Sequence, residues 1–240
     1  MCGDMSERVI LNRVATYYES ALWSKEYRFA KEYLFGRGFT EEVLRVFGVG
    51  FAPPQIQLEL SDKEDAFLRS IEHIREFKAD RFRDRVVFPV RDAIGNVCGF
   101  SGRVIPPSER VKYMNSAESA AYKKTDLLFG LHQVRENIFK SNKVIICEGF
   151  TDVMAFYQSN IPVAVASMGT SLTKKHLYQL ARYTKNIYFA FDGDDGGDKA
   201  QALAFSRATE LGFNVGNITI PKGLDPAEFL LQPLENRILK

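Results

Sequence analysis

The spacing of hydrophobic residues changes along the chain and separates two kinds of structure. Over about the first 75 residues, apolar residues recur every three or four positions, as in SERVILNRVATYYESAL and TEEVLRVFGVG. This spacing predicts helices, with Ser6 and Thr40 as N-caps. The stretches RVVFPV and VCGFSGRVI are instead rich in strand-forming residues, and RDAIGN between them is typical of a turn. The N-terminal part is therefore expected to combine helices with a β-hairpin.

From residue 143 onward, short apolar runs alternate with helical patterns. The runs KVIIC, PVAVAS, NIYFAF and NVGNITI are separated by TDVMAFYQSN, LTKKHLYQLARY and DKAQALAFSRATEL. Apolar strands that alternate with helices predict a parallel sheet covered by helices on its faces. The expected fold is α/β: an α+β N-terminal subdomain at 1–126, a connecting helix at 127–142, and a mainly parallel sheet covered by helices at 143–240.

Acidic residues follow three of the predicted strands. Glu148 comes directly after KVIIC, Asp192 after NIYFAF, and Asp225 shortly after the last strand. Ligands of parallel sheets bind beyond the carboxyl ends of the strands, so these acids are expected to share one edge. Asp152 lies about one helical turn past Glu148, and Asp194 lies two residues past Asp192.

The acidic stretch FDGDDGGDKA allows more than one interpretation. A helix N-cap accounts for one aspartate, Asp195 or Asp198. A calcium-binding loop is excluded, because Gly196 and Leu203 occupy two of its ligand positions. Divalent metals remain as the alternative to capping, since Mg²⁺ takes one or two carboxylates together with water and phosphate oxygens. The acids after the other strands favour the metal.

The segment ASMGTSLTKK connects a predicted strand to a predicted helix. Gly169 and Thr170 lie at this junction, where free N–H groups of a helix N-terminus can bind an anion. An ordinary Ser/Thr cap accounts for the same pattern, so both interpretations stay open here.

Charge is unevenly distributed although the net charge is only +2. Residues 78–126 contain ten lysines and arginines against six aspartates and glutamates, a local net charge of +4. A basic segment of this kind suggests a polyanionic partner, and a solvated surface is the alternative.

Composition excludes several other classes of protein. With 45% hydrophobic residues the chain can bury a core, and it contains neither a signal peptide nor an apolar run of membrane-spanning length. A cytoplasmic protein without a membrane partner is expected. The three cysteines and three histidines are scattered and form no CxxC, so no zinc site is expected within the chain.

Longer motifs resemble a known family. EGFTDVMAF followed by FDGDDGGDKA resembles the Toprim domain, which has a glutamate after one strand and a DxD pair after a later strand. The segments YLFGRGFTEEVLRVFGVGFAPP, FRDRVVFPVRDAIGNVCGFSGRV, KYMNSAES, LLFGL, VASMGTSLT and LDPAEF resemble the catalytic core of DnaG-type bacterial DNA primases, which is an RNA polymerase domain with a Toprim fold. The resemblance covers almost the whole chain, with the motifs in the same order.

The resemblance implies roles for individual residues. Glu148 matches the catalytic glutamate, Asp192 and Asp194 match the metal-binding pair, and Asp152 and Asp225 match further acids near the metals. The positions implied to line the template groove or to approach the nucleotide are Arg83, Arg85, Arg91, Arg103, Lys112, Asn115, Lys124, Gly169 and Thr170.

The implied function is synthesis of short RNA primers on single-stranded DNA during replication, by nucleotidyl transfer from ribonucleoside triphosphates. The implied cofactors are two or more Mg²⁺ or Mn²⁺ ions, and the implied location is the nucleoid, at the replication fork and its primosome.

The zinc-binding and helicase-binding modules of the family have no counterpart in this sequence, so a contact with the replicative helicase is expected only through a domain outside it. The chain is then either a fragment or naturally short. Two alternatives stay open, a Toprim-type metal-dependent nuclease and a non-catalytic single-stranded DNA binding module.

Overall fold

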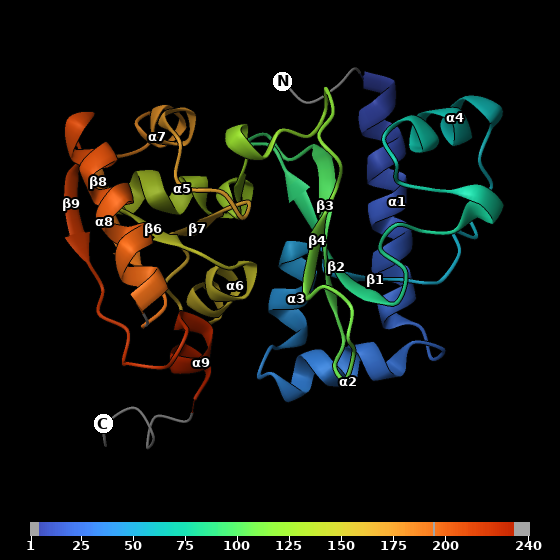
Figure 1. The fold of residues 1–240 in the computed structure, drawn as a ribbon, viewed down its shortest axis with the longest axis horizontal. Coiled ribbons are helices and arrows are strands. Elements are labelled where there is room, and N and C mark those ends of the chain that lie inside the picture. Colours follow the sequence, from blue (N-terminus) through green and yellow to red (C-terminus); the bar gives the residue numbers. More distant parts are fainter. Residues whose placement is uncertain (1–4, 194, 233–240) are drawn as a thin grey trace. The chain divides into compact units, whose positions relative to one another are not determined.

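The structure, a computed structural model, describes residues 5–193 and 195–232, and for Met5, Lys78 and residues 195–200 the backbone alone. It divides into two compact units. The first comprises the chain up to Arg37 together with Leu44–Lys123, and the second comprises Gly38–Val43 together with the chain from Lys124 onward. Each unit contains its own β-sheet (Figure 1).

The first unit is built on an antiparallel sheet of four strands in the order β1-β2-β3-β4. The strands are β1 (Gly50–Ala52), β2 (Arg85–Arg91), β3 (Val97–Val104) and β4 (Tyr113–Asn115). The helical segments are α1 (Met5–Trp23), α2 (Arg28–Gly36), α4 (Asp62–Ser70), the 3₁₀ turn η1 (Glu76–Lys78) and, from Leu44 onward, α3 (Glu41–Phe47). The predicted mixture of helices and a β-hairpin is confirmed.

Helix α1 covers this sheet because one of its faces is apolar. Leu11, Val14, Tyr18 and Leu22 recur at helical spacing and are buried, and α1 contacts β1 and β3. At Gly50 a Cβ atom would lie 2.5 Å from the backbone of Tyr18, so only glycine allows this close approach of β1 to the helix.

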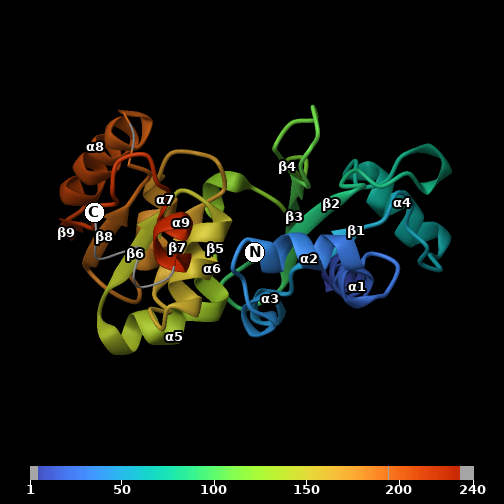
Figure 2. The same cartoon turned by 90° about the horizontal axis from the view of Figure 1, so that it is seen from below.

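The β2–β3 hairpin closes where the sequence predicts a turn. Oδ1 of Asp92 accepts hydrogen bonds from the backbone N–H groups of Ile94, Gly95 and Asn96, at 3.1, 2.9 and 2.9 Å. An aspartate that binds the backbone ahead of it in this way is typical of tight turns. Figure 2 shows that the loop between β3 and β4 extends beyond the sheet of this unit.

The second unit contains a five-stranded sheet in the order β5-β7-β6-β8-β9, in which only β5 is antiparallel to its neighbour. Its strands are β5 (Leu128–Phe129), β6 (Val144–Cys147), β7 (Ala164–Ser167), β8 (Asn186–Ala190) and β9 (Asn214–Asn217), and its helices are η2 (Lys124–Asp126), α5 (Leu131–Ser141), α6 (Phe150–Gln158), α7 (Lys174–Leu180), α8 (Asp195–Glu210) and α9 (Pro226–Leu231). Figure 2 shows α5 and α8 on opposite sides of this sheet. The predicted mainly parallel sheet covered by helices is confirmed.

One segment differs from the expectation. The stretch that begins LLFGL was expected to be helical throughout, but Leu128 and Phe129 pair with Ser167 and Ala166 of β7. Gly130 then adopts a positive φ of 85°, and α5 begins after it. The apolar pair forms an edge strand because tertiary pairing outweighs a weak local helix preference.

Within the described ranges, no helix combines the length and the apolar character needed to cross a bilayer.

Candidate metal and nucleotide site

Strand register brings the predicted acidic residues to one edge of the second unit's sheet. Cys147, the last residue of β6, pairs with Ala166 of β7 and with Ala190 of β8. Glu148 and Asp192 therefore follow adjacent strand ends. The backbone N–H of Asp192 donates to Oε1 of Glu148 at 3.3 Å, which places the two residues in direct contact.

The turn after β8 is held against the loop that leads to Asp225. Gly193 donates its N–H to the carbonyl of Leu224 at 3.0 Å, and its own carbonyl accepts from the N–H of Gly223 at 3.0 Å. A Cβ atom on Gly193 would lie 2.4 Å from the carbonyl oxygen of Pro221. The glycine is thus required for this contact, which brings the Asp192 turn and the Asp225 loop together.

Asp225 and Asp152 fix the start of α9. Asp225 is its N-cap, and Oδ1 of Asp225 accepts from the N–H of Glu228 at 2.7 Å. Asp152 is buried, with 3% of its surface exposed; its Oδ2 accepts from the N–H of Gly149 at 2.9 Å and its Oδ1 from the N–H of Ala227 at 3.2 Å. Both oxygens of Asp152 are thus used to tie the start of α6 to the start of α9.

The acidic residues repel one another electrostatically. Burial raises the pKa of Asp152 to about 8, and the charges of Asp225 and Asp192 contribute to the rise. Burial also raises the pKa of the Cys147 thiol, and the charges of Asp152, Asp192 and Glu148 add to that effect. A divalent cation would relieve this repulsion, and carboxylate oxygens are the ligands that Mg²⁺ prefers.

The carboxylate oxygens suit a divalent cation, but the side chains that the structure describes do not by themselves complete a metal site. Among the residues that the structure describes, no three histidine, cysteine or acidic side chains converge as a metal cluster. Asp194, which the sequence assigns to the metal-binding pair, lies outside the described residues.

A cavity of about 330 Å³ opens beside Glu148. Its polar lining comes from Glu148, Ser167, Gly169, Thr170 and Ser171, and its apolar lining from Ile146, Leu172, Phe191 and Ala204. The loop after β7 is ordered by Ser167, whose Oγ donates to the carbonyl of Thr170 at 2.7 Å, and by Arg207 of α8, whose Nη1 donates to the carbonyl of Leu172 at 2.7 Å.

Gly169 and Thr170 belong to this loop and precede the cap of the next helix. The N-cap of α7 is Thr173, whose Oγ1 accepts from the N–H of His176 at 3.1 Å. Gly169 has a positive φ of 73°, as the sharp turn after β7 requires. Gly169 and Thr170 therefore line the cavity beside Glu148 and do not cap the helix.

The basic residues of the first unit have different surroundings. Arg85 is 1% exposed, and its Nη1 donates to the carbonyls of Val111, Lys112 and Gly102 at 2.8, 3.3 and 3.4 Å. Burial lowers the pKa of Arg85, and the charges of Arg110 and Arg83 add to that effect. The guanidinium of Arg85 thus supports the β3–β4 loop from inside, and its burial does not fit a direct contact with nucleic acid.

The other basic positions lie nearer the surface. Nη1 of Arg103 donates to the hydroxyl of Tyr113 on β4 at 2.6 Å, and Nη1 of Arg91 donates to the carbonyl of Gly95 at 2.9 Å. Arg83 and Lys112 are exposed, whereas Asn115 and Lys124 are partly buried.

Sequence reasoning missed several residues of this site. Ser167, Ser171 and Phe191 line the cavity, and the register of the parallel strands places Ser167 and Phe191 level with Glu148. A pairing of the predicted strands in this register would have found Ser167 and Phe191.

Known proteins resemble the chain in both units. Residues 17–135 match a family model described as DNA primase catalytic core, N-terminal domain, and residues 145–230 match one described as Toprim-like. A DNA primase of Aquifex aeolicus (strain VF5) is 36% identical over 230 residues, which cover 92% of this chain and 46% of that protein. The chain thus spans less than half the length of the curated relatives it matches.

Solved structures of primase catalytic domains resemble the chain as well. The E. coli primase catalytic core is 33% identical with a TM-score of 0.83, and the match covers 92% of this chain and 74% of that one. A DnaG primase catalytic domain bound to ssDNA is 32% identical with a TM-score of 0.83, over 92% of this chain and 75% of that one. The chain belongs to the DnaG-type DNA primase family and corresponds to its catalytic core. Its second unit carries the Toprim domain, a metal-binding fold.

Proposed function

We propose that this chain is a DNA-directed RNA polymerase that synthesises short RNA primers on single-stranded DNA. The observation that carries the proposal is the contact between Glu148 and Asp192 at the carboxyl edge of the parallel sheet, with the Asp225 loop held against Gly193. A similar DnaG domain has been solved bound to ssDNA, which supports single-stranded DNA as the template of this chain as well.

The reaction joins a ribonucleotide to the growing RNA. The 3′-hydroxyl oxygen attacks the α-phosphorus of a ribonucleoside triphosphate, a new phosphorus–oxygen bond forms, and the bond to the pyrophosphate leaving group breaks. Two Mg²⁺ or Mn²⁺ ions, when bound, would neutralise charge on the attacking and leaving oxygens.

The acidic residues would hold these ions. Glu148, Asp192, Asp194 and Asp225 are the proposed metal ligands, and Asp152 supports the Asp225 loop through the N–H of Ala227. The carboxylate of Glu148 either binds an ion or accepts the proton of the attacking hydroxyl.

The two units have different proposed tasks. The first unit would bind the template through phosphate contacts from Arg83, Arg103 and Lys112, and through Asn115 at the end of β4. Arg85 and Arg91 hold backbone carbonyls in that unit. The second unit would bind the triphosphate through Lys124 and the loop of Gly169 and Thr170. The proposed place of action is the replication fork in the nucleoid, with the replicative helicase as a neighbour.

Template-directed incorporation tests the proposal. Labelled ribonucleotides, a single-stranded DNA template and Mg²⁺ or Mn²⁺ should give short RNA, and Glu148→Gln should give none. Cleavage of labelled DNA without nucleotides would support the nuclease instead. DNA binding that is indifferent to Mg²⁺, without synthesis, would support a binding module.

A further inference from the structure

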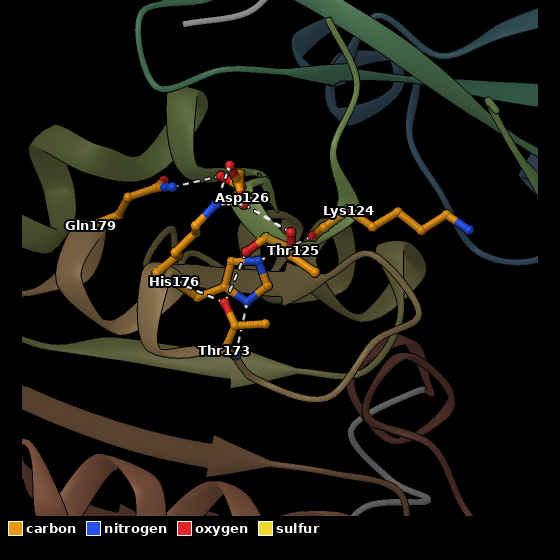
Figure 3. A network of polar contacts seen from close by, with 7 residues as sticks. Lys124, Thr125, Asp126, Thr173, His176 and Gln179 are labelled. Atoms are coloured by element: carbon orange, nitrogen blue, oxygen red, sulfur yellow. Dashed lines mark hydrogen bonds and ion pairs between the residues drawn. The ribbon is translucent and has the colours of Figure 1, made fainter. Parts of the chain in front are cut away.

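Three successive carbonyl groups at the start of the second unit are held by one short helix and its cap (Figure 3). The carbonyl of Lys124 lies 3.2 Å from Nε2 of His176, that of Thr125 accepts from Oγ1 of Thr173 at 2.8 Å, and that of Asp126 accepts from Nε2 of Gln179 at 2.5 Å. All three carbonyl groups of η2 are therefore held by α7 and its N-cap.

Hydrogen bonding determines which ring nitrogen of His176 carries the proton. Nδ1 lies 3.2 Å from the backbone N–H of Thr173, which can only donate, so Nδ1 is the acceptor. Nε2 must then carry the hydrogen and donate to the Lys124 carbonyl. His176 is buried, and burial lowers its pKa, which keeps the ring neutral and this arrangement intact.

Strand register places Lys124 at the edge that carries the acids. β5 runs antiparallel to β7, and Leu128 pairs with Ser167, the last residue of β7. The residues before Leu128 therefore lie beyond the carboxyl end of β7. Ser167 is level with Glu148 on the neighbouring strand, so Lys124 and Glu148 share this edge.

We propose that His176, Thr173 and Gln179 are positioning residues that hold the backbone from which Lys124 reaches the triphosphate of an incoming ribonucleotide. The inference rests on the proposed function and adds a supporting group to the same site. Figure 3 shows the side chain of Lys124 extending away from the cluster that holds its carbonyl.

A fixed backbone matters for lysine because its side chain is long and flexible. The ammonium group is a point charge on four rotatable carbons, so only its anchor can be made rigid in advance. Thr173 also follows directly on the loop that lines the cavity beside Glu148. The short helix α7 and its N-cap thus hold both the backbone of Lys124 and one end of the loop that lines the cavity.

A double-mutant cycle tests the inference on the full chain. Lys124→Met should lower kcat/KM for the ribonucleotide by about ten-fold, since it removes a charged contact. His176→Phe should lower it by about five-fold through loss of the donor to the Lys124 carbonyl. In the Lys124→Met background, His176→Phe should cost less than about two-fold, because a positioning residue acts only through the group that it holds.

Matched variants control for general destabilisation. Lys175→Met removes an exposed ion pair with the Asp126 side chain at 2.8 Å but leaves the three carbonyl contacts, so it should change kcat/KM less than two-fold. His176→Gln retains a donor and should keep more activity than His176→Phe. If His176→Phe does not fold, Gln179→Met replaces it in the same cycle.

Independent, multiplicative effects of the two substitutions would overturn the inference, and so would an unchanged kcat/KM in His176→Phe. Calorimetric titration of the same variants with MgATP measures their affinity for the nucleotide. The effects of the Lys124 and His176 substitutions on this affinity should again be non-additive. A wild-type chain that binds MgATP but makes no RNA would contradict the proposed function, and the cycle would then be read from the MgATP affinities alone. A wild-type chain that does not bind MgATP would overturn the inference.

Discussion

Tyr18 donates its hydroxyl proton to Oδ2 of Asp80 across 2.5 Å in the interior of the first unit. The hydroxyl oxygen of Tyr18 lies 2.8 Å from Nε2 of His73, and because this hydroxyl already donates to Asp80, Nε2 of His73 must donate to it. The chain of donors runs from His73 through Tyr18 to Asp80, whose Oδ1 accepts from the N–H of Phe82 at 2.6 Å. This buried network joins α1 to the segment that leads into β2.

The network predicts two opposed dependences of stability on pH. Burial raises the pKa of Asp80 to about 7, so ionisation of this carboxyl in the unfolded chain makes the fold less stable as pH rises from about 4 to about 7. Burial lowers the pKa of His73 to about 3, so protonation of the unfolded chain makes the fold less stable as pH falls from about 6.5 to about 3. Between about pH 4 and 6.5 the two effects cancel.

Substituting either Asp80 or His73 should reveal the pH dependence of stability that the other residue contributes. In Asp80→Asn the free energy of unfolding should fall, relative to wild type, as pH drops below about 6.5, by up to about 1.4 kcal/mol per pH unit. In His73→Gln it should fall, relative to wild type, as pH rises from about 4 to about 7. Urea unfolding at several pH values measures both slopes, and slopes equal to wild type in both variants would contradict the assignment.

Asp192→Asn should abolish RNA synthesis without loss of the fold. The substitution removes a charge that raises the pKa of Asp152, so the melting temperature without Mg²⁺ should equal or exceed that of wild type. Primer synthesis and thermal melting measure the two effects. The control is Glu136→Gln, which neutralises an exposed acid on α5 and should leave synthesis unchanged. Full synthesis by Asp192→Asn would contradict the metal assignment.

Gly193→Ala should destabilise the second unit by about 1–3 kcal/mol. The added Cβ would meet the Pro221 carbonyl oxygen at 2.4 Å and push the Asp225 loop away from the Asp192 turn, so RNA synthesis should fall as well. Gly36→Ala is the control, because a Cβ there meets no atom within 4 Å. Urea unfolding compares the two, and equal stability of both variants would argue against the close contact.

Lys112→Ala and Arg85→Lys should weaken single-stranded DNA binding in different ways. Loss of a phosphate contact by Lys112→Ala should flatten the slope of log affinity against log salt by roughly 0.7. Arg85→Lys keeps the charge but loses the guanidinium Nη1 that donates to the Val111 and Lys112 carbonyls, so affinity should fall with an unchanged slope. Fluorescence anisotropy over a salt series separates the two, and a slope change in Arg85→Lys would indicate a direct phosphate contact.

The sequence by itself determined the elements and the edge that carries the acids. Helical spacing, apolar strands and turn residues are local patterns, so α1, the β2–β3 hairpin and the strands from β6 to β9 could be predicted from neighbouring residues. A general rule for parallel sheets was then enough to expect Glu148 and Asp192 at a common edge.

Only the tertiary structure decided what individual polar side chains do there. Asp152 binds the N–H of Ala227, 75 residues away, and His176 binds the carbonyl of Lys124, 52 residues away. Arg85 is a basic residue of the kind that contacts nucleic acid at a protein surface, yet its side chain is buried beneath the β3–β4 loop. Such roles depend on which distant backbone groups need a partner after folding, and no local pattern in the sequence records that need.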